Sequence, residues 1–397
     1  MSELHLAVAL DGAGWHPAAW REPGARPGEL FTARYWADVV AEAEAGLLDF
    51  VTFEDGLTLQ SSSPTEHDTR TDRVRGRLDA VLTAARVAPL TRHIGLVPSV
   101  TATHTEPFHI SKALATLDHV SRGRAGVLLR ACAPPHEAAH FGRRTFPLPV
   151  GESAEEAADH IEVVRRLWDS WEDDAEIRDV ATGRFVDRDR LHHIDFVGRH
   201  FRVRGPSITP RPPQGQPLVT ATAGSTAPRP GLVDLVYVAP RDLDEARAAA
   251  SAAFGSEAAP RHVFADLTVL LAPDTATAAA RRDRLDEAAG DPYDPEGAFF
   301  TGTPAGLAEL LLEWRRAGMT GFRLRPAVLA DDLPAITRGL VPELRRRGAF
   351  RGAYGAGTLR ALLGLERPPN RYAAGGAGST THPTRRGART PGTGRTA

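Results

Sequence analysis

The stretch LTRHIGLVPSVTATHTEPFHISKALATLDHVSRGRAGVLLR, residues 90–130, decides the fold. Within it, His93–Val97 is a short apolar run with β-branched residues, which predicts a strand. Ser99–Pro107 is rich in hydroxyl side chains and predicts a loop. Pro107 suits the first turn of a helix with apolar residues at helical spacing, and Ala125–Leu129 predicts a second strand. Parallel strands joined by such a crossover helix form a βαβ unit, and ligands collect in the loops that follow the strands.

Further apolar runs alternate with helical segments along the rest of the chain. The other predicted strands are Leu4–Leu10, Asp49–Phe53, Leu218–Ala223, Asp234–Val238, His262–Leu271 and Gly321–Leu324. About eight strands alternating with helices indicate an α/β fold of the (β/α)8 TIM-barrel type. We expect this barrel to span residues 1–371, with a β-rich insertion at about 175–216, where turn residues are frequent. Residues 372–397 are rich in Gly, Thr, Arg and Pro, which predicts a disordered tail.

Composition and single motifs exclude several classes of protein. The formal net charge of −2, with 25% charged residues, indicates neither a nucleic-acid partner nor an anionic membrane. No apolar run is long enough for a membrane span and the first residues lack a basic segment, so we expect a cytoplasmic protein. Cys132 is the single cysteine, which excludes an internal disulfide and a thiolate zinc cluster. His192 and His193 would point to opposite faces of a strand, so we expect no metal site.

Candidate ligand-binding residues follow several predicted strands. A long loop containing His16 and Trp20 follows the first strand, and loops of this length are often functional. Asp55 follows the second strand, and Ser99 and Thr101 follow the third. After the strand that ends near residue 223 come Gly224, Ser225 and Thr226, whose N–H and O–H groups suit a phosphate. The adjacent Glu54 and Asp55 do not suit a glycosidase, since paired catalytic acids normally come from different strands.

Residues 94–126 also resemble a known family. Their order of IGL, T-A-T, P-F-H, TLD, VS and GRA is similar to a stretch of the bacterial luciferase-like flavin monooxygenases. Within this family, the stretch resembles the branch of the nitrilotriacetate and dibenzothiophene-sulfone monooxygenases. LWDSWEDD (residues 167–174) and GTPAGLAELLLEWRRAGMTGFRL (residues 302–324) resemble the same family.

The resemblance implies a two-component monooxygenase. Such an enzyme takes reduced FMN (FMNH2) from a flavin reductase partner and uses O2 to oxygenate a small organic substrate. Carried over residue by residue, it implies catalytic, substrate-side roles for His16 and Trp20, and cofactor-binding roles for Asp55, Ser99, Thr101, Gly224, Ser225 and Thr226. We also expect a homo-oligomer.

Two other functions stay open at this stage. One is a degenerate, non-catalytic flavin-binding paralogue, because Val127 and Leu128 stand where the family has Trp and then Asn or Gln. The segment after Thr226 is also shorter than in the family, and Pro228 and Pro230 discourage a helix there. The other is an oxidoreductase on the same barrel that depends on the deazaflavin F420.

Overall fold

A computed structural model describes residues 3–61, 69–131, 135–142 and 151–373 of the chain. Most of the predicted tail (374–397), residues 62–68 and Cys132 lie outside the described residues. Tyr372, at the predicted start of the tail, stacks on His192 with ring centroids 5.1 Å apart.

The centre of the molecule is a closed barrel of eight parallel strands, so the predicted fold is confirmed. Each strand pairs in parallel with its neighbours in the order β1, β2, β3, β4, β9, β10, β11, β13, and β13 returns to β1. A further strand, β12 (Ala298–Gly302), pairs with the second half of β11. The barrel strands are β1 His5–Leu10, β2 Phe50–Phe53, β3 Gly95–Thr101, β4 Gly126–Arg130, β9 Leu218–Thr222, β10 Leu235–Val238, β11 His262–Leu271 and β13 Gly321–Pro326.

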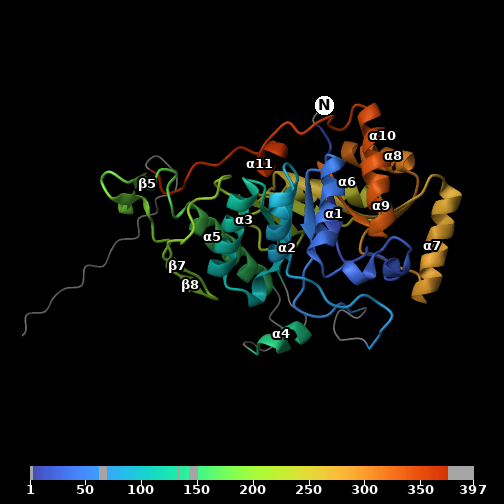
Figure 1. Ribbon diagram of the computed structural model, residues 1–397, viewed down its shortest axis with the longest axis horizontal. Helices are drawn as coiled ribbons and strands as arrows, with labels where there is room; N and C mark the ends of the chain where they lie inside the picture. Colours follow the sequence, from blue (N-terminus) through green and yellow to red (C-terminus); the bar gives the residue numbers. More distant parts are fainter. Residues whose placement is uncertain (1–2, 62–68, 132–134, 143–150, 374–397) are drawn as a thin grey trace, which may run out of the picture.

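Helices cover the outside of the barrel (Figure 1). They are α1 Ala33–Ala45, α2 Ala80–Val87, α3 Pro107–Ser121, α5 Glu152–Asp169, α6 Leu243–Phe254, α7 Thr275–Ala289, α8 Pro304–Arg316, α9 Leu329–Ala335 and α10 Val341–Arg346. A short helix, α4 (Pro135–Phe141), lies away from the barrel. The sequence predicts one helix over Leu333–Arg347, but a π-helical turn at Ile336–Leu340 separates α9 from α10.

Alternate residues of the strands fill the barrel interior. The layer nearer the amino-terminal strand ends is apolar, and α11 (Leu359–Leu362) closes that end. Its buried members include Ala7, Phe50, Val97, Leu128, Leu218, Tyr237, Phe264 and Leu359. The next inward positions toward the carboxyl ends are polar, so chemistry-bearing side chains collect at one end of the barrel.

Two local predictions are corrected. Ser99 and Thr101 lie in strand β3 and not in a loop, because Ser99 pairs with Leu128 of β4 and Thr101 pairs with Arg130. The spacing of Ser153 and Glu156 predicts a capping box, but α5 begins at Glu152. Its cap is Gly151, at φ +80°, and no side chain caps the helix.

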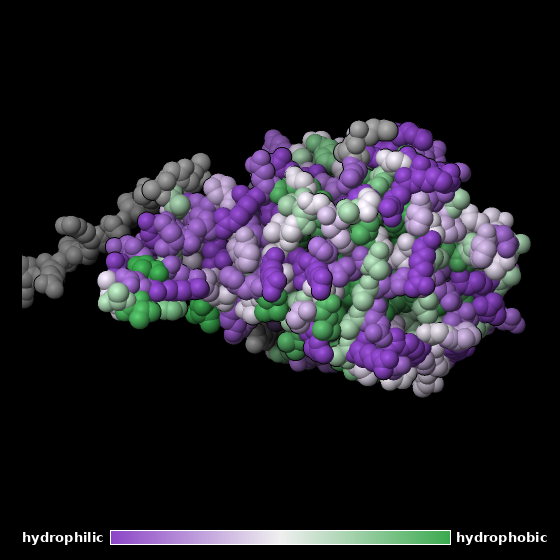
Figure 2. Space-filling view, turned by 45° about the horizontal axis from the view of Figure 1, so that its top comes forward, coloured by the Kyte–Doolittle hydropathy of each residue, from purple (hydrophilic) through white to green (hydrophobic). Residues whose placement is uncertain are grey.

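The insertion between β4 and β9 contains two antiparallel hairpins. β5 (Glu176–Asp179) pairs with β6 (Arg184–Val186), and β7 (Phe196–Val197) pairs with β8 (Arg202–Val203). They form the end of the molecule away from α7, where a few hydrophobic residues lie among mostly hydrophilic ones (Figures 1 and 2). The exposed large apolar side chains of this region are Val180, Phe185, Val197 and Ile208.

The connection from β9 to β10 has no helix within residues 223–234, as Pro228 and Pro230 predicted. Val236 and Val238, on the outer face of β10, border an apolar groove of about 330 Å³ against α6. Among the described residues, no helix is both long and apolar enough to cross a bilayer.

Candidate active site

A buried charge network occupies the polar layer of the barrel. Arg323 of β13 donates to Asp266 of β11 through Nε (2.6 Å) and Nη2 (2.5 Å), and Arg325 donates to the same carboxylate. Arg323 also reaches Glu54 Oε1 at 3.3 Å, and its guanidinium lies 3.9 Å from the centre of the Tyr237 ring. Burial would raise the pKa of Asp266, but the two arginines hold this pKa below its usual value. These ion pairs hold the charged groups of Arg323, Arg325, Asp266 and Glu54 in place, just below the carboxyl-terminal end of the barrel.

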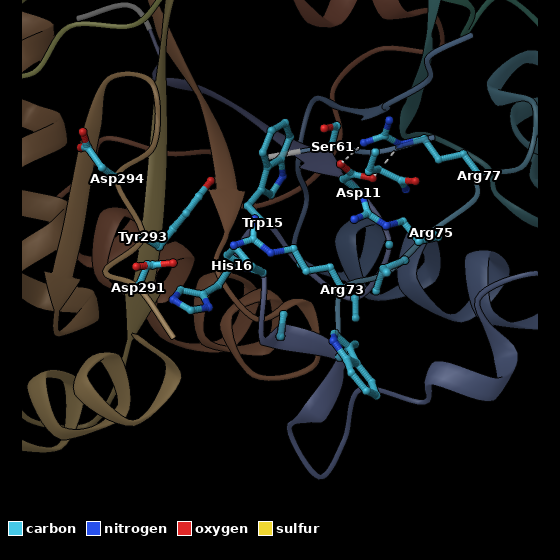
Figure 3. A pocket seen from close by; sticks show the side chains of 18 of the residues that line it. Asp11, Trp15, His16, Ser61, Arg73, Arg75, Arg77, Asp291, Tyr293 and Asp294 are labelled. Atoms are coloured by element: carbon cyan, nitrogen blue, oxygen red, sulfur yellow. Dashed lines mark hydrogen bonds and ion pairs between the residues drawn. The ribbon is translucent and has the colours of Figure 1, made fainter. Parts of the chain in front are cut away.

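A cavity of about 510 Å³ opens at this end, beside β1 and β13 (Figure 3). Its described lining comes from residues 11–20 after β1, residues 60–61 and 73–77, and residues 291–294 before β12. Gly14 (φ +139°) lets the first segment lie directly on β13, because a Cβ there would stand 2.4 Å from the carbonyl oxygen of Ala327. The volume is that of a small-molecule site.

His16 and Trp20 both border this cavity, and their substrate-side role stays a prediction. The His16 ring is buried, and its Nε2 lies 3.0 Å from Asp286 Oδ1. Its Nδ1 accepts a hydrogen bond from the N–H of Ala18, so Nε2 carries the proton that Asp286 accepts. Burial is the main cause that lowers the His16 pKa. With both nitrogens occupied, His16 fastens the first loop to α7.

Asp55 serves a local structural role. Its carboxylate accepts hydrogen bonds from the N–H groups of Gly56 (2.7 Å) and Ala80 (2.9 Å), the second at the start of α2. Burial raises the pKa of Asp55. Arg130 donates to the Asp55 carbonyl, which ties the ends of β2 and β4 together.

Ser99 and Thr101 point into the barrel, on the same face of β3 as the core residue Val97. Ser99 is 1% exposed, and its Oγ has no hydrogen-bond partner within the described part of the chain. Thr268 Oγ1 on β11 is buried and unpartnered in the same way. Buried hydroxyls without partners are uncommon, and a polar ligand would satisfy them.

Gly224, Ser225 and Thr226 form a tight turn after β9. The Ser225 hydroxyl and N–H both donate to the carbonyl oxygen of Thr222, at 2.7 and 3.0 Å. Gly224 adopts φ +77°, and an added Cβ there would meet nothing within 4 Å. In the described chain the N–H groups of Gly224 and Thr226 make no hydrogen bond. Free N–H groups in such a turn form an anion-binding concavity.

These groups do not share one cavity. His16 and Trp20 border the 510 Å³ cavity, whereas Gly224 and Thr226 border the groove outside β9 and β10. Asp55, Ser99 and Thr101 border neither of these two spaces. The cofactor-binding roles of Asp55, Ser99, Thr101, Gly224, Ser225 and Thr226 therefore stay predictions.

The sequence reasoning missed Asp266, Arg323, Arg325, Arg73 and Tyr293. The alternation of Arg323 and Arg325 in an apolar strand was a usable signal, because charges two apart share one face. Arg73, Arg75 and Arg77 alternate in the same manner. No local pattern marks Tyr293, whose place depends on the contact of its N–H with Asp286.

Comparison with known proteins settles the family. The profile of the luciferase-like monooxygenases matches residues 13–321, which is most of the barrel. The chain belongs to this family. The resemblance found in the sequence is thereby confirmed, and the protein is a flavin-dependent monooxygenase.

Relatives match the luciferase-like chain over nearly its whole length. It is 29% identical to nitrilotriacetate monooxygenase component A of Aminobacter aminovorans, over 94% of this chain and 98% of that protein. It is 27% identical to the dibenzothiophene-sulfone monooxygenase of Rhodococcus erythropolis (strain XP), over 92% and 97% of the two chains. The crystal structure of a long-chain alkane monooxygenase superimposes with a TM-score of 0.81 at 21% identity, covering 91% and 96% of the chains.

Single groups of this luciferase-like barrel suit separate parts of a flavin mononucleotide, although these groups do not open onto one shared cavity. Free N–H groups at Gly224 and Thr226 suit its phosphate, and the unpartnered Ser99 hydroxyl suits a polar edge of its ring. Leu128 lies in the apolar interior layer at 2% exposure and offers no hydrogen bond. Among the described residues, no group of three His, Cys, Asp or Glu side chains is arranged to hold a metal ion.

Proposed function

We propose that this chain is the oxygenase component of a two-component, FMN-dependent monooxygenase that acts on a small organic substrate. A separate flavin reductase would supply FMN in its reduced form. The strongest support is the near-complete match to a relative named component A, over 94% of this chain. Reduced flavin supplies, when bound, the electrons that activate O2.

In this proposal, residues of the chain bind the flavin, orient the substrate and exclude water. The N–H groups of Gly224 and Thr226 hold the phosphate, and the Ser225 hydroxyl keeps their turn in shape. Ser99 and Thr101 donate to the ring from β3. His16 holds the first loop over the barrel end, where Trp20 contributes to the wall that orients substrate and excludes water.

A titration with FMN tests the phosphate site. Ser225→Ala removes the hydroxyl that donates to Thr222, so we expect FMN to bind about tenfold more weakly. Ser251→Ala, on the exposed surface of α6, is the matched control and should bind FMN like the unmodified protein. An unchanged dissociation constant for Ser225→Ala would remove the turn from the cofactor site.

A non-catalytic paralogue is the second candidate function. It is favoured by the apolar surroundings of Leu128 and by the absence of a helix in residues 223–234. If neither oxidised nor reduced FMN binds at millimolar concentration, this candidate replaces the first. F420-dependent enzymes share the barrel fold, so the titration includes F420. Preferential F420 binding with hydride transfer and no oxygen chemistry would assign the chain to that class.

A further inference from the structure

The described acidic residues that border the 510 Å³ cavity each lie within 4 Å of an arginine. Asp11 pairs with Arg77 at 2.6 Å. Asp291 lies 3.6 Å from an arginine of the neighbouring loop, Arg70. Asp294 lies 3.7 Å from Arg241. Within the described part of the lining, each carboxylate thus already has an arginine close by.

Arg73 is such a further charge. It borders the cavity, and within the described part of the chain it has no ion pair and no hydrogen bond. Its Nε is buried and lacks an acceptor. Figure 3 shows its side chain extending toward Trp15 and His16. A buried donor without an acceptor is costly, and a ligand oxygen would remove that cost.

The backbone holds Arg73 in this position. The carbonyl oxygen of Asp72 accepts hydrogen bonds from the Trp20 indole N–H (3.1 Å) and from Arg21 (3.1 Å). The backbone next to Arg73 is thus fixed to the first loop before any ligand arrives. Preorganisation of this kind lowers the cost of binding.

The rest of the lining offers aromatic surface. The Trp15 indole N–H donates to the Ala9 carbonyl oxygen at 3.0 Å, and the Trp20 indole N–H is also occupied. Both rings therefore present carbon surface to the cavity. The Tyr293 ring borders the cavity as well, and its hydroxyl makes no hydrogen bond in the described chain.

We propose that this cavity binds the organic substrate as an anion. Its carboxylate, or a similarly flat anionic group, pairs with the Arg73 guanidinium, whose planar fork matches two oxygens. The apolar body of the substrate lies against Trp15 and Trp20. This assignment names the substrate class of the monooxygenase and so rests on the proposed function.

A pair of probes of equal shape and unequal charge tests the proposal. The full-length protein is titrated with 2-naphthoate and with 2-naphthamide by calorimetry. We expect naphthoate to bind at least about tenfold more tightly than naphthamide. Arg73→Gln should abolish this preference by weakening naphthoate alone, and Arg73→Lys should keep part of it because the charge remains. Arg34→Gln, an exposed position on α1, controls for the loss of one positive charge.

Each outcome either supports or overturns the anion site. Equal binding of the two probes to the unmodified protein overturns it, and so does an unchanged preference in Arg73→Gln. If Arg73→Gln fails to fold, the preference for naphthoate over naphthamide is compared between Arg73→Lys and the unmodified protein. A preference that Arg73→Lys leaves unchanged then overturns the anion site. FMN binding is measured on the same samples. If Arg73→Gln weakens FMN to the same extent, Arg73 holds the flavin phosphate and the proposal falls. Absence of FMN binding with intact probe discrimination refutes the proposed cofactor and leaves the anion site standing.

Discussion

A histidine in α5 makes the stability of this protein depend on pH. His160 is 0% exposed, and neither ring nitrogen has a hydrogen-bond partner in the described chain. Its ring stands nearly perpendicular to the Phe201 ring, with ring centroids 6.4 Å apart. Burial lowers the pKa of His160 to about 3, from an ordinary value of 6.5. The folded protein therefore holds this ring neutral where the unfolded chain would protonate it.

The sign and size of the effect follow from proton linkage. Between pH 6.5 and about 3 the unfolded chain binds one more proton than the folded chain at this residue, so stability falls as the pH falls. From pH 7 to pH 5, the two pKa values give a loss of about 2 kcal/mol in the free energy of unfolding. His160→Leu removes the titrating ring and keeps an apolar side chain of similar size. This variant should lack that part of the pH dependence.

Urea unfolding of the two proteins at pH 7 and pH 5 measures the difference. We expect the unmodified protein to lose about 2 kcal/mol more than His160→Leu over this interval. His109→Gln, an exposed histidine on α3, should behave like the unmodified protein. Equal losses in the unmodified protein and His160→Leu would show that His160 is protonated, or reaches water, in the folded state.

Two further substitutions test the barrel. Asp266→Asn leaves two buried arginines without their main carboxylate and should lower the free energy of unfolding by about 3–5 kcal/mol; a loss below about 1 kcal/mol would mean that other groups balance this charge. Gly14→Ala places a Cβ 2.4 Å from the Ala327 carbonyl oxygen at φ +139°, and should cost about 2 kcal/mol or more in urea unfolding. Gly28→Ala, where an added Cβ meets nothing within 4 Å, is its control, and equal stability of the two variants would contradict the close approach at Gly14.

Most of the fold could be predicted because its determinants are local. Apolar runs of strand length alternate with helical spacing, and a parallel barrel buries both faces of each strand. Proline at positions 228 and 230 correctly predicted a connection without a helix. Predictions of secondary structure failed where pairing with a strand distant in the sequence outweighed the preference of the local residues for a loop. The hydroxyl-rich start of the third loop is strand, because its backbone pairs with β4.

The sequence by itself determined the barrel, the family and the strand ends that carry polar residues. The tertiary structure alone decided which of these residues meet. His16 forms a hydrogen bond with Asp286, which lies 270 positions later in the sequence. Asp266 accepts hydrogen bonds from two arginines of the neighbouring strand. Among the described residues Arg73 has no acidic partner, although its neighbour Arg77 is paired with Asp11. The reason is that barrel closure and strand register set distances between remote side chains, and no local pattern encodes those distances.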